Sequence, residues 1–177
     1  MRIVISLCLF LISFSPVNAD EIDLSNFQEM MARMAKVDNF AYEGPSFLKG
    51  LSIEKVRALG ELKDEIKEEV ENKYYEGETN PYYTFIFKDG LEVRCRYVTK
   101  HVSGPHVQFI YVKITSKTWP ISNDLGVGKN ISNLDDALGA PSEIKPSLLM
   151  YRGETEEVRF SHNNGIITKI EFIYYTG

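Results

Sequence analysis

The side chains of this sequence best suited to catalysis are three histidines, His101, His106 and His162, and Cys95. A second cysteine, Cys8, lies in an apolar N-terminal run. Cys95 as a nucleophile, with His101 or His106 as its general base, is conceivable from their separation along the chain. However, Cys95 falls in an alternating pattern on the side that we expect to face inward, where a thiol behaves as a small buried hydrophobe. We therefore predict no catalytic residue and expect that the protein is not an enzyme.

The sequence signals for metal binding and for phosphate binding are also weak. His101 and His106 flank the loop sequence VSGP, and two histidines without a third ligand make a poor zinc site. The stretch LGVGKN, at 125–130, places glycines before an expected helix but lacks the lysine-serine ending of a phosphate loop. We predict no metal site and no cofactor.

The first 20 residues, MRIVISLCLFLISFSPVNAD, have the pattern of a secretory signal peptide. Arg2 precedes an apolar run over 3–14, and Val17-Asn18-Ala19 forms a small-residue cleavage site. The run is shorter than the roughly 20 residues of a membrane span. Cys8 does not directly follow a cleavage site, which argues against a lipid anchor. We expect cleavage after Ala19, a periplasmic or secreted protein and no integral membrane segment.

Charge and cysteine content restrict the class of protein further. The formal charge of −5 is mildly acidic, which argues against a nucleic-acid partner. Cys95 is the single cysteine after residue 19, so the exported chain has no internal disulfide. Small exported eukaryotic domains usually depend on disulfides, so the composition favours a bacterial periplasm.

An N-terminal amphipathic helix and its connector are expected over 20–50. Ser25 and Gln28 have capping-box spacing, so Ser25 is predicted as the N-cap. Apolar residues then follow at helical spacing, and the helix should end near Asp38. They are Phe27, Met30, Met31 and Met34. This stripe is expected to pack on the core, although a partner-binding surface is the alternative.

A short capped helix is predicted from Ser52, with Val56 and Leu59 facing inward and Gly60 ending it. A second helix is predicted from Glu61 to about Lys73. Its apolar residues, Leu62, Ile66 and Val70, recur every four positions, and its acidic residues would form a solvated face.

The pattern then changes from helical to alternating over 82–98, which predicts a β-hairpin around Lys88-Asp89-Gly90. A two-residue loop and a three-residue loop are both conceivable. The three-residue loop pairs Phe85 with Val93 and Tyr83 with Cys95, and it places every large apolar side chain on one face. We therefore predict the three-residue loop, with Gly90 in the left-handed conformation.

Further strands are expected at 106–116, 148–153, 156–165 and 166–175. In the third strand, Ile110, Val112 and Ile114 should face inward, and Phe109 should face the opposite way. In the last strand the residues expected inside are Ile166, Ile170, Phe172 and Tyr174. Before these strands, NISNLDDALGAP at 130–141 repeats the earlier pattern of a capped helix ended by glycine, with Ser132 matching Ser52.

The predicted fold class is therefore α+β. Two units, 51–116 and 126–177, each with a helix followed by antiparallel strands, should share one sheet within a single domain over 51–177.

The pattern GVGKNISNLDDALGAP…LLMYRG…VRFSHNNGIITKIEF resembles the repeat of the β-lactamase inhibitory protein family and of the small outer-membrane-assembly lipoproteins with that fold. The resemblance extends over 126–174 and, more loosely, over 51–98. The first copy lacks the proline after Leu-Gly, and the second has Pro141 and Pro146 in place of a second helix. The resemblance implies a protein that binds other proteins, and it implies no catalytic residue.

Three functional hypotheses follow. The first is an exported protein that binds another protein, as an inhibitor or an immunity protein that neutralises an enzyme or toxin. The alternatives are an envelope-assembly or scaffolding factor and a small-molecule-binding protein. Aromatic and arginine side chains on the sheet face opposite the core are the candidate partner-binding residues. They are Tyr82, Arg94, Arg96, Phe109, Tyr111 and Tyr175, with the loop around Trp119 as an alternative docking site.

Overall fold

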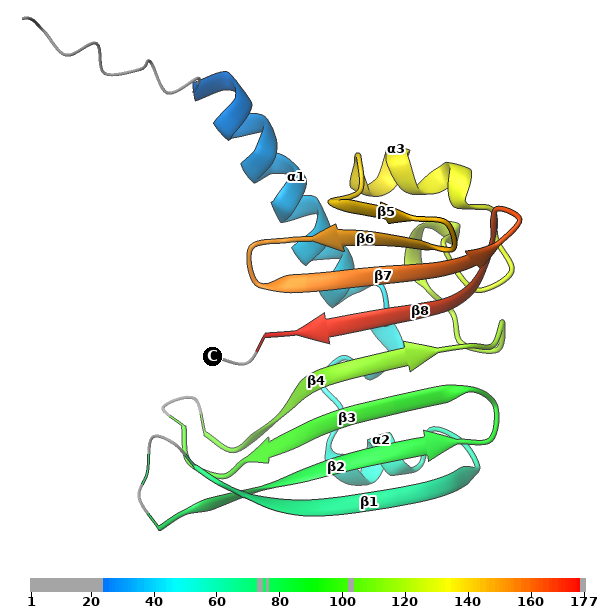
Figure 1. The fold of residues 1–177 in the computed structure, drawn as a ribbon. Coiled ribbons are helices and arrows are strands. Elements are labelled where there is room, and N and C mark those ends of the chain that lie inside the picture. Colours follow the sequence, from blue (N-terminus) through cyan, green and yellow to red (C-terminus); the bar gives the residue numbers. More distant parts are fainter. Residues whose placement is uncertain (1–23, 73–74, 76, 102–103, 176–177) are drawn as a thin grey trace, which may run out of the picture.

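The computed structural model describes residues 24–72, 75, 77–101 and 104–175, and the predicted signal peptide lies outside them. The described chain forms one antiparallel sheet of eight strands, in the order β1-β2-β3-β4-β8-β7-β6-β5 (Figure 1). The strands are β1 (Leu62–Glu71), β2 (Thr79–Phe87), β3 (Leu91–Val98), β4 (His106–Ile114), β5 (Glu143–Lys145), β6 (Leu148–Arg152), β7 (Glu156–Asn163) and β8 (Ile166–Tyr174). An N-terminal helix and a few short helices accompany the sheet, so the expected α+β class is confirmed.

The helices pack on one face of the sheet, which we call the inner face. They are α1 (Leu24–Glu43), α2 (Ile53–Arg57) and α3 (Leu134–Leu138), with short 3-10 turns at Ser46–Leu48, Ser122–Asp124 and Ile131–Asn133. A row of paired inner-face residues runs through Phe85, Val93, Val112, Phe172 and Val158. All five are fully buried in a core that also contains apolar residues of the three helices.

The outer face carries the alternate residues of the same strands. One paired row across it is Thr84, Arg94, Tyr111, Ile173 and Glu157. An antiparallel sheet commonly packs its core on one face and exposes polar side chains on the other.

Helix α1 differs from its prediction at both ends. Ser25 lies inside the helix, so the predicted N-cap is wrong, and the helix continues past Asp38 to Glu43. Phe27 and Met30 are exposed because the first turns of α1 extend beyond the sheet edge formed by β5 (Figure 1). The buried positions come later, at Val37, Phe40 and Ala41. The Phe40 ring lies 6.1 Å from that of Phe160 and 5.8 Å from that of Phe172, so this half of the helix joins the core.

The predicted helix from Glu61 to Lys73 is wrong, because 62–71 form the edge strand β1. This strand pairs with β2 from Leu62↔Phe87 to Glu71↔Thr79. A spacing of four residues fits one face of a helix and one face of a strand equally well. Backbone pairing with β2 selects the strand, and Ile66 and Val70 remain exposed on its outer face.

The hairpin register agrees with the prediction. Phe85 pairs with Val93 and Tyr83 with Cys95 across a three-residue loop. Gly90 has φ +85°, and a Cβ there would lie 2.6 Å from Thr115 Oγ1. Only glycine fits this position without strain.

Three register shifts interrupt the pairing of the described strands, one in β1 between Leu62 and Asp64, one in β4 and one in β8. The latter two reverse predicted side-chain directions. In β4, Arg94 pairs with Tyr111 but Cys95 pairs with Phe109, so Ile110 is the extra residue. Phe109 therefore shares the inner face with Cys95 and packs against the core, and its predicted outward direction is wrong. Ile110, expected inside, is only half-buried.

In β8, the register shifts between Lys169, opposite Ser161, and Ile167, opposite His162. Ile167 is buried and Ile166 is exposed, which reverses the expectation for Ile166.

Local caps position the short helices. Ser52 Oγ accepts the Lys55 N–H at 3.4 Å, as predicted for the N-cap of α2. Before α3, Asn130 rather than Ser132 is the capping side chain, since its Oδ1 accepts the Ser132 N–H at 2.9 Å. Gly139, at φ +77°, ends α3 as expected. None of the described helices is long and apolar enough to cross a membrane.

Candidate functional site: the outer face and a pocket beside it

Four predicted partner-binding residues lie together on the outer face, over β2, β3 and β4. Tyr82 is the pairing partner of Arg96, and Arg94 is that of Tyr111. Gln108, opposite Arg96, completes the group. We call Tyr82, Arg94, Arg96, Gln108 and Tyr111 the outer-face cluster.

Side-chain contacts hold the cluster in place. Arg96 Nε donates to Gln108 Oε1 at 2.7 Å, and its Nη1 donates to the Tyr82 hydroxyl at 3.3 Å. Arg94 donates to Glu68 Oε2 at 3.1 Å, and its guanidinium lies 5.9 Å from the centre of the Tyr82 ring. Among the described residues, no carboxylate forms an ion pair with Arg96. Its charge is thus oriented by neutral groups and is available to an anion.

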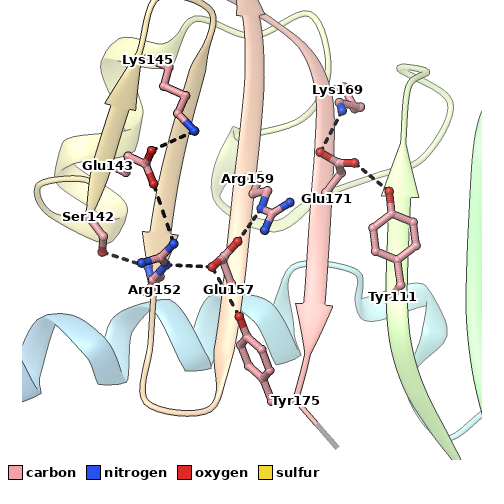
Figure 2. A network of polar contacts seen from close by, with 10 residues as sticks. All are labelled: Tyr111, Ser142, Glu143, Lys145, Arg152, Glu157, Arg159, Lys169, Glu171 and Tyr175. Carbon is pink, nitrogen blue, oxygen red and sulfur yellow. Dashed lines mark hydrogen bonds and ion pairs between the residues drawn. The ribbon is translucent and has the colours of Figure 1, made fainter.

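Tyr111 connects the cluster to the other half of the sheet. Its hydroxyl donates to Glu171 Oε1 at 2.7 Å, and Lys169 lies 2.9 Å from the other oxygen of that carboxylate (Figure 2). Burial alone would raise the pKa of Glu171, but the hydrogen bonds from Lys169 and Tyr111 outweigh it and lower the pKa. The pKa of Tyr111 is raised, first by burial and then by this bond, so the phenol remains protonated and directed at Glu171.

A second set of ion pairs covers the outer face over β6 and β7. Glu157 is only 1% exposed and contacts the guanidinium groups of Arg152, at 2.9 Å, and Arg159 (Figure 2). The Tyr175 hydroxyl lies 3.5 Å from the same carboxylate, and the Tyr175 side chain is exposed. Both guanidinium groups therefore have a carboxylate partner, in contrast to Arg96.

The two remaining predicted residues are not on this surface. Phe109 faces the core side, as described above. Trp119 is 8% exposed, with its ring 5.1 Å from Phe47 and 6.1 Å from Phe87. Its Nε1 donates to the Asp89 carbonyl at 3.3 Å. Trp119 therefore joins the connector before α3 to the core, and its indole is not an accessible docking group.

A pocket that the sequence did not predict lies where β4 and β8 separate. The two strands pair only from Tyr111↔Ile173 to Ile114↔Ile170. Beyond these pairs is a cavity of about 320 Å³. Its lining comes from the end of α1, the connector after it, β4, β7 and the end of β8: Tyr42, Pro45, Leu48, Lys49, Gly50, Val107, Gln108, Phe109, Glu156, Tyr174 and Tyr175.

Glu156 is the notable polar group of this lining, because it is only 3% exposed. The Tyr42 hydroxyl donates to its Oε1 at 2.8 Å, while Oε2 has no hydrogen-bond partner of good geometry among the described residues. Burial raises the pKa of Glu156, and nearby Asp38 raises it further, against the opposing effects of the Tyr42 hydroxyl, the Tyr175 backbone N–H and the Thr155 side chain. The hydrogen bond between Tyr42 and Glu156 is also the main reason why the pKa of Tyr42 is raised. Glu156 stands beside Glu157 in a mostly acidic stretch, so the sequence does not indicate that its side chain is buried.

Asp38 positions this part of β7. Its carboxylate accepts the backbone N–H groups of Glu154 at 2.9 Å, Thr155 at 3.3 Å and Glu156 at 2.9 Å. Tyr174 adds a second link to α1, since its hydroxyl donates to the Ala41 carbonyl at 2.9 Å. The pocket wall is thus fixed to α1 by side-chain contacts.

The side chains considered for catalysis are Cys95, His101 and His106. Cys95 is a fully buried free thiol, and burial raises its pKa to about 12. The rings of His101 and His106 lie 5.0 Å apart, and His106 Nδ1 is 2.9 Å from the Gly104 carbonyl oxygen. No group of three potential metal ligands occurs among the described residues.

Comparison with known proteins gives little to set beside this geometry. No protein-family model matches the chain, and no curated protein matches it. Among solved structures, the chain is similar to that of a DUF4309 family protein, YjgB, from Bacillus subtilis subsp. subtilis str. 168. The two sequences are 15% identical, the match covers 83% of this chain and 99% of that one, and the TM-score is 0.40.

Proposed function

We propose that this is an exported protein that binds another protein through the outer-face cluster. One observation carries the proposal: α1, α2 and α3 all pack on the inner face, while the opposite face presents arginine and tyrosine side chains held in fixed positions. Arginine and tyrosine are enriched among the residues that dominate binding energies at protein interfaces. Side chains that are already ordered lose less entropy on binding.

The partner surface that fits the cluster is acidic. Arg96 is oriented by Gln108 and Tyr82 and forms no ion pair within the described chain, so a partner carboxylate can bind it without displacing an existing one. Tyr111 adds a flat half-buried ring beside it, whose hydroxyl is already bonded to Glu171. Exposed Ile66 and Val70 on β1 extend the same face with apolar surface.

Within this proposal the chain contains two structural repeats, as the sequence suggested. Each consists of a short helix followed by four antiparallel strands: α2 with β1 to β4, and α3 with β5 to β8. The sheet order supports the idea. In each half the last strand, β4 or β8, lies at the centre of the sheet and the first strand, β1 or β5, lies at an edge. Together with the resemblance over 126–174 to an inhibitory family, this arrangement favours a neutralising role, as an inhibitor or immunity protein in the periplasm.

An affinity capture with residues 20–177 as bait in periplasmic extract tests the proposal. The wild type is compared with Arg96→Ala and with Lys145→Ala, a control that also removes one positive charge from the outer face but lies on β5 at the far edge. We expect a partner that the wild type and Lys145→Ala retain and Arg96→Ala loses. The isolated partner should then lose activity when the wild type is added.

A partner retained equally by Arg96→Ala would contradict docking on the cluster. A partner whose activity is unchanged in the complex would contradict the neutralising role and favour assembly or scaffolding. Circular dichroism of all three proteins establishes that the substitutions leave the fold intact.

A further inference from the structure

We propose that the pocket between β4, β8 and the end of α1 is a binding site for a protonated amine carried on an apolar or aromatic stem. The site is distinct from the outer-face cluster, although Gln108 lies at the edge of both. Three features of the lining carry the inference: a buried acceptor without a donor, aromatic walls and a small volume.

The acceptor is Glu156 Oε2. It is buried and has no hydrogen-bond partner of good geometry among the described residues, while the other oxygen of the same carboxylate receives the Tyr42 hydroxyl. The Tyr175 backbone N–H and the Thr155 side chain lie near the carboxyl and lower its pKa. Buried polar atoms in folded proteins nearly always have a partner, so an isolated one in a pocket wall indicates a missing donor. A carboxylate accepts most strongly from a charged N–H group.

The charges around Glu156 also favour a cation. Asp38 lies close enough to raise the pKa of Glu156, so two carboxyl groups are near each other. Asp38 is satisfied by three backbone N–H groups, which leaves none of them for Glu156 Oε2. The cation in the lining, Lys49, is directed to Glu43 at 2.5 Å. A ligand ammonium would therefore meet a carboxylate that no described side-chain cation neutralises.

The walls suit the rest of such a ligand. Tyr42, Phe109, Tyr174 and Tyr175 contribute aromatic surface, and Leu48, Pro45 and Val107 contribute aliphatic surface. Aromatic rings attract a cation through their faces, and apolar walls bind its stem. The volume of about 320 Å³ lies at the small end of ligand pockets, which favours a single ring or a short chain.

An ammonium bearing N–H bonds fits better than a quaternary one, because Oε2 needs a donor as well as a charge. Two sources present this chemistry: a free small amine, and the side chain of a lysine in a peptide. Both are within the proposal, and separate probes distinguish them.

Isothermal titration calorimetry on residues 20–177 tests the site with four probes. Benzylamine represents a free aromatic amine and Nα-acetyl-lysine methylamide represents a peptide lysine. Benzyl alcohol lacks the charge, and benzyltrimethylammonium keeps the charge but lacks N–H. We expect saturable one-site binding of benzylamine, of the lysine derivative, or of both. If benzylamine is the tighter of the two amines, benzyl alcohol and benzyltrimethylammonium should each bind more than about tenfold more weakly than benzylamine.

Two matched variants locate the binding. Glu156→Gln should weaken the amine more than about tenfold, because the charged acceptor is lost. Glu154→Gln, the same charge change on an exposed side chain two residues away, should leave binding unchanged. Tighter binding of benzylamine assigns the site to free amines, and tighter binding of the lysine derivative assigns it to peptides.

Absence of saturable binding by either amine overturns the proposal, as does equal binding of benzyl alcohol and benzylamine. Unchanged affinity in Glu156→Gln overturns it too. If Glu156→Gln does not fold, the comparison of the four probes on the wild type still decides the question, and Tyr175→Ala, at an exposed residue of the pocket lining, provides a second variant. Failure of the amine to bind has no bearing on the outer-face cluster, whose test uses Arg96.

Discussion

At the residue scale, Glu156 combines a buried carboxyl with incomplete hydrogen bonding, and this should reduce stability. Its pKa is raised above the ordinary value of 4.5, first by burial and then by Asp38, so the folded state binds the proton more tightly than the unfolded state. The stability associated with this group is therefore present below pH 4.5 and is lost as pH rises through the folded-state pKa. Tyr42 and Tyr174 also face this carboxyl and remain neutral over that range.

We accordingly predict that Glu156→Gln is more stable than the wild type at pH 7.5, because an amide carries no charge to desolvate. The advantage should disappear below pH 4.5, where the glutamate is protonated in both states. Thermal unfolding measured across this pH range checks the prediction, with Glu154→Gln as the exposed control. A Glu156→Gln variant that is less stable than the wild type at pH 7.5 but equal to it below pH 4.5 would show that the fold stabilises the charged form.

Cys95 provides a second prediction at this scale. The thiol is fully buried in β3 and its pKa is raised to about 12, so it should resist alkylation in the native protein and react at once in denaturant. Cys95→Ala should cost about 1 kcal/mol of unfolding free energy, as expected for removing one buried atom, without changing partner binding. Iodoacetamide labelling followed by mass spectrometry, with and without urea, measures the first effect. Rapid labelling of the native protein would contradict the hairpin register.

At the scale of elements, the contact between α1 and the β6–β7 turn should contribute strongly to stability. Asp38 accepts three backbone N–H groups of that turn, and hydrogen bonds to charged groups contribute about 1.5–3 kcal/mol. We predict that Asp38→Ala lowers the unfolding free energy by about this amount. Asn39→Ala, at the exposed neighbouring position on α1, should change it little. Urea denaturation of the three proteins gives the comparison.

Gly153 offers an independent check on the same contact. A Cβ at Gly153 would lie 2.0 Å from Asp38 Oδ1, so Gly153→Ala should also be destabilising. Because the clash requires the aspartate, the double variant Asp38→Ala/Gly153→Ala should lose less unfolding free energy than the sum of the losses in the two single variants. Additive effects would mean that alanine is disfavoured at 153 for a reason other than Asp38.

The elements also show how far the sequence determines this structure. The register of β2 and β3 followed from burial, because the alternative two-residue loop would have paired Phe85 with Arg94 instead of Val93. The strand β1 did not follow, since Leu62, Ile66 and Val70 satisfy helical and extended spacing alike and the decision depends on pairing with β2. Local pattern determines an element only where a single period fits it.

Bulges set a similar limit on the candidate site. Tyr82, Arg94 and Arg96 were placed correctly because β2 and β3 pair without interruption over these residues. The extra residue in β4 turned Phe109 inward, and no feature of its sequence marks the shift. The pocket depends on that turn and on the short β4–β8 pairing, together with the distant Glu156 and Tyr42. The pocket arises from tertiary contacts between segments that are distant in sequence, and the spacing of residue types along the chain does not predict such contacts.

At the scale of the whole molecule, the two halves of the sheet share one core. The buried cluster includes Phe85 and Val93 from the first half together with Phe160 and Phe172 from the second. Phe40 of α1 lies against both Phe160 and Phe172, and Gly44, just after α1, would bring a Cβ within 3.1 Å of the Phe172 ring. A continuous core of this kind favours a single cooperative unfolding transition rather than separate unfolding of the two halves.

Trp119 makes this expectation measurable. It is the one tryptophan of the sequence, and it packs against Phe47 and against Phe87 of the first half. Ile170, fully buried on β8, lies in the second half. We predict that Ile170→Val lowers the unfolding free energy by about 0.5–1.5 kcal/mol, the usual cost of removing one buried methylene. The urea midpoint followed by Trp119 fluorescence should shift as far as the midpoint followed by far-ultraviolet circular dichroism, because one transition carries both signals. If the fluorescence midpoint stays fixed while the dichroism curve splits in two, the two halves of the sheet unfold independently and the shared core does not couple them.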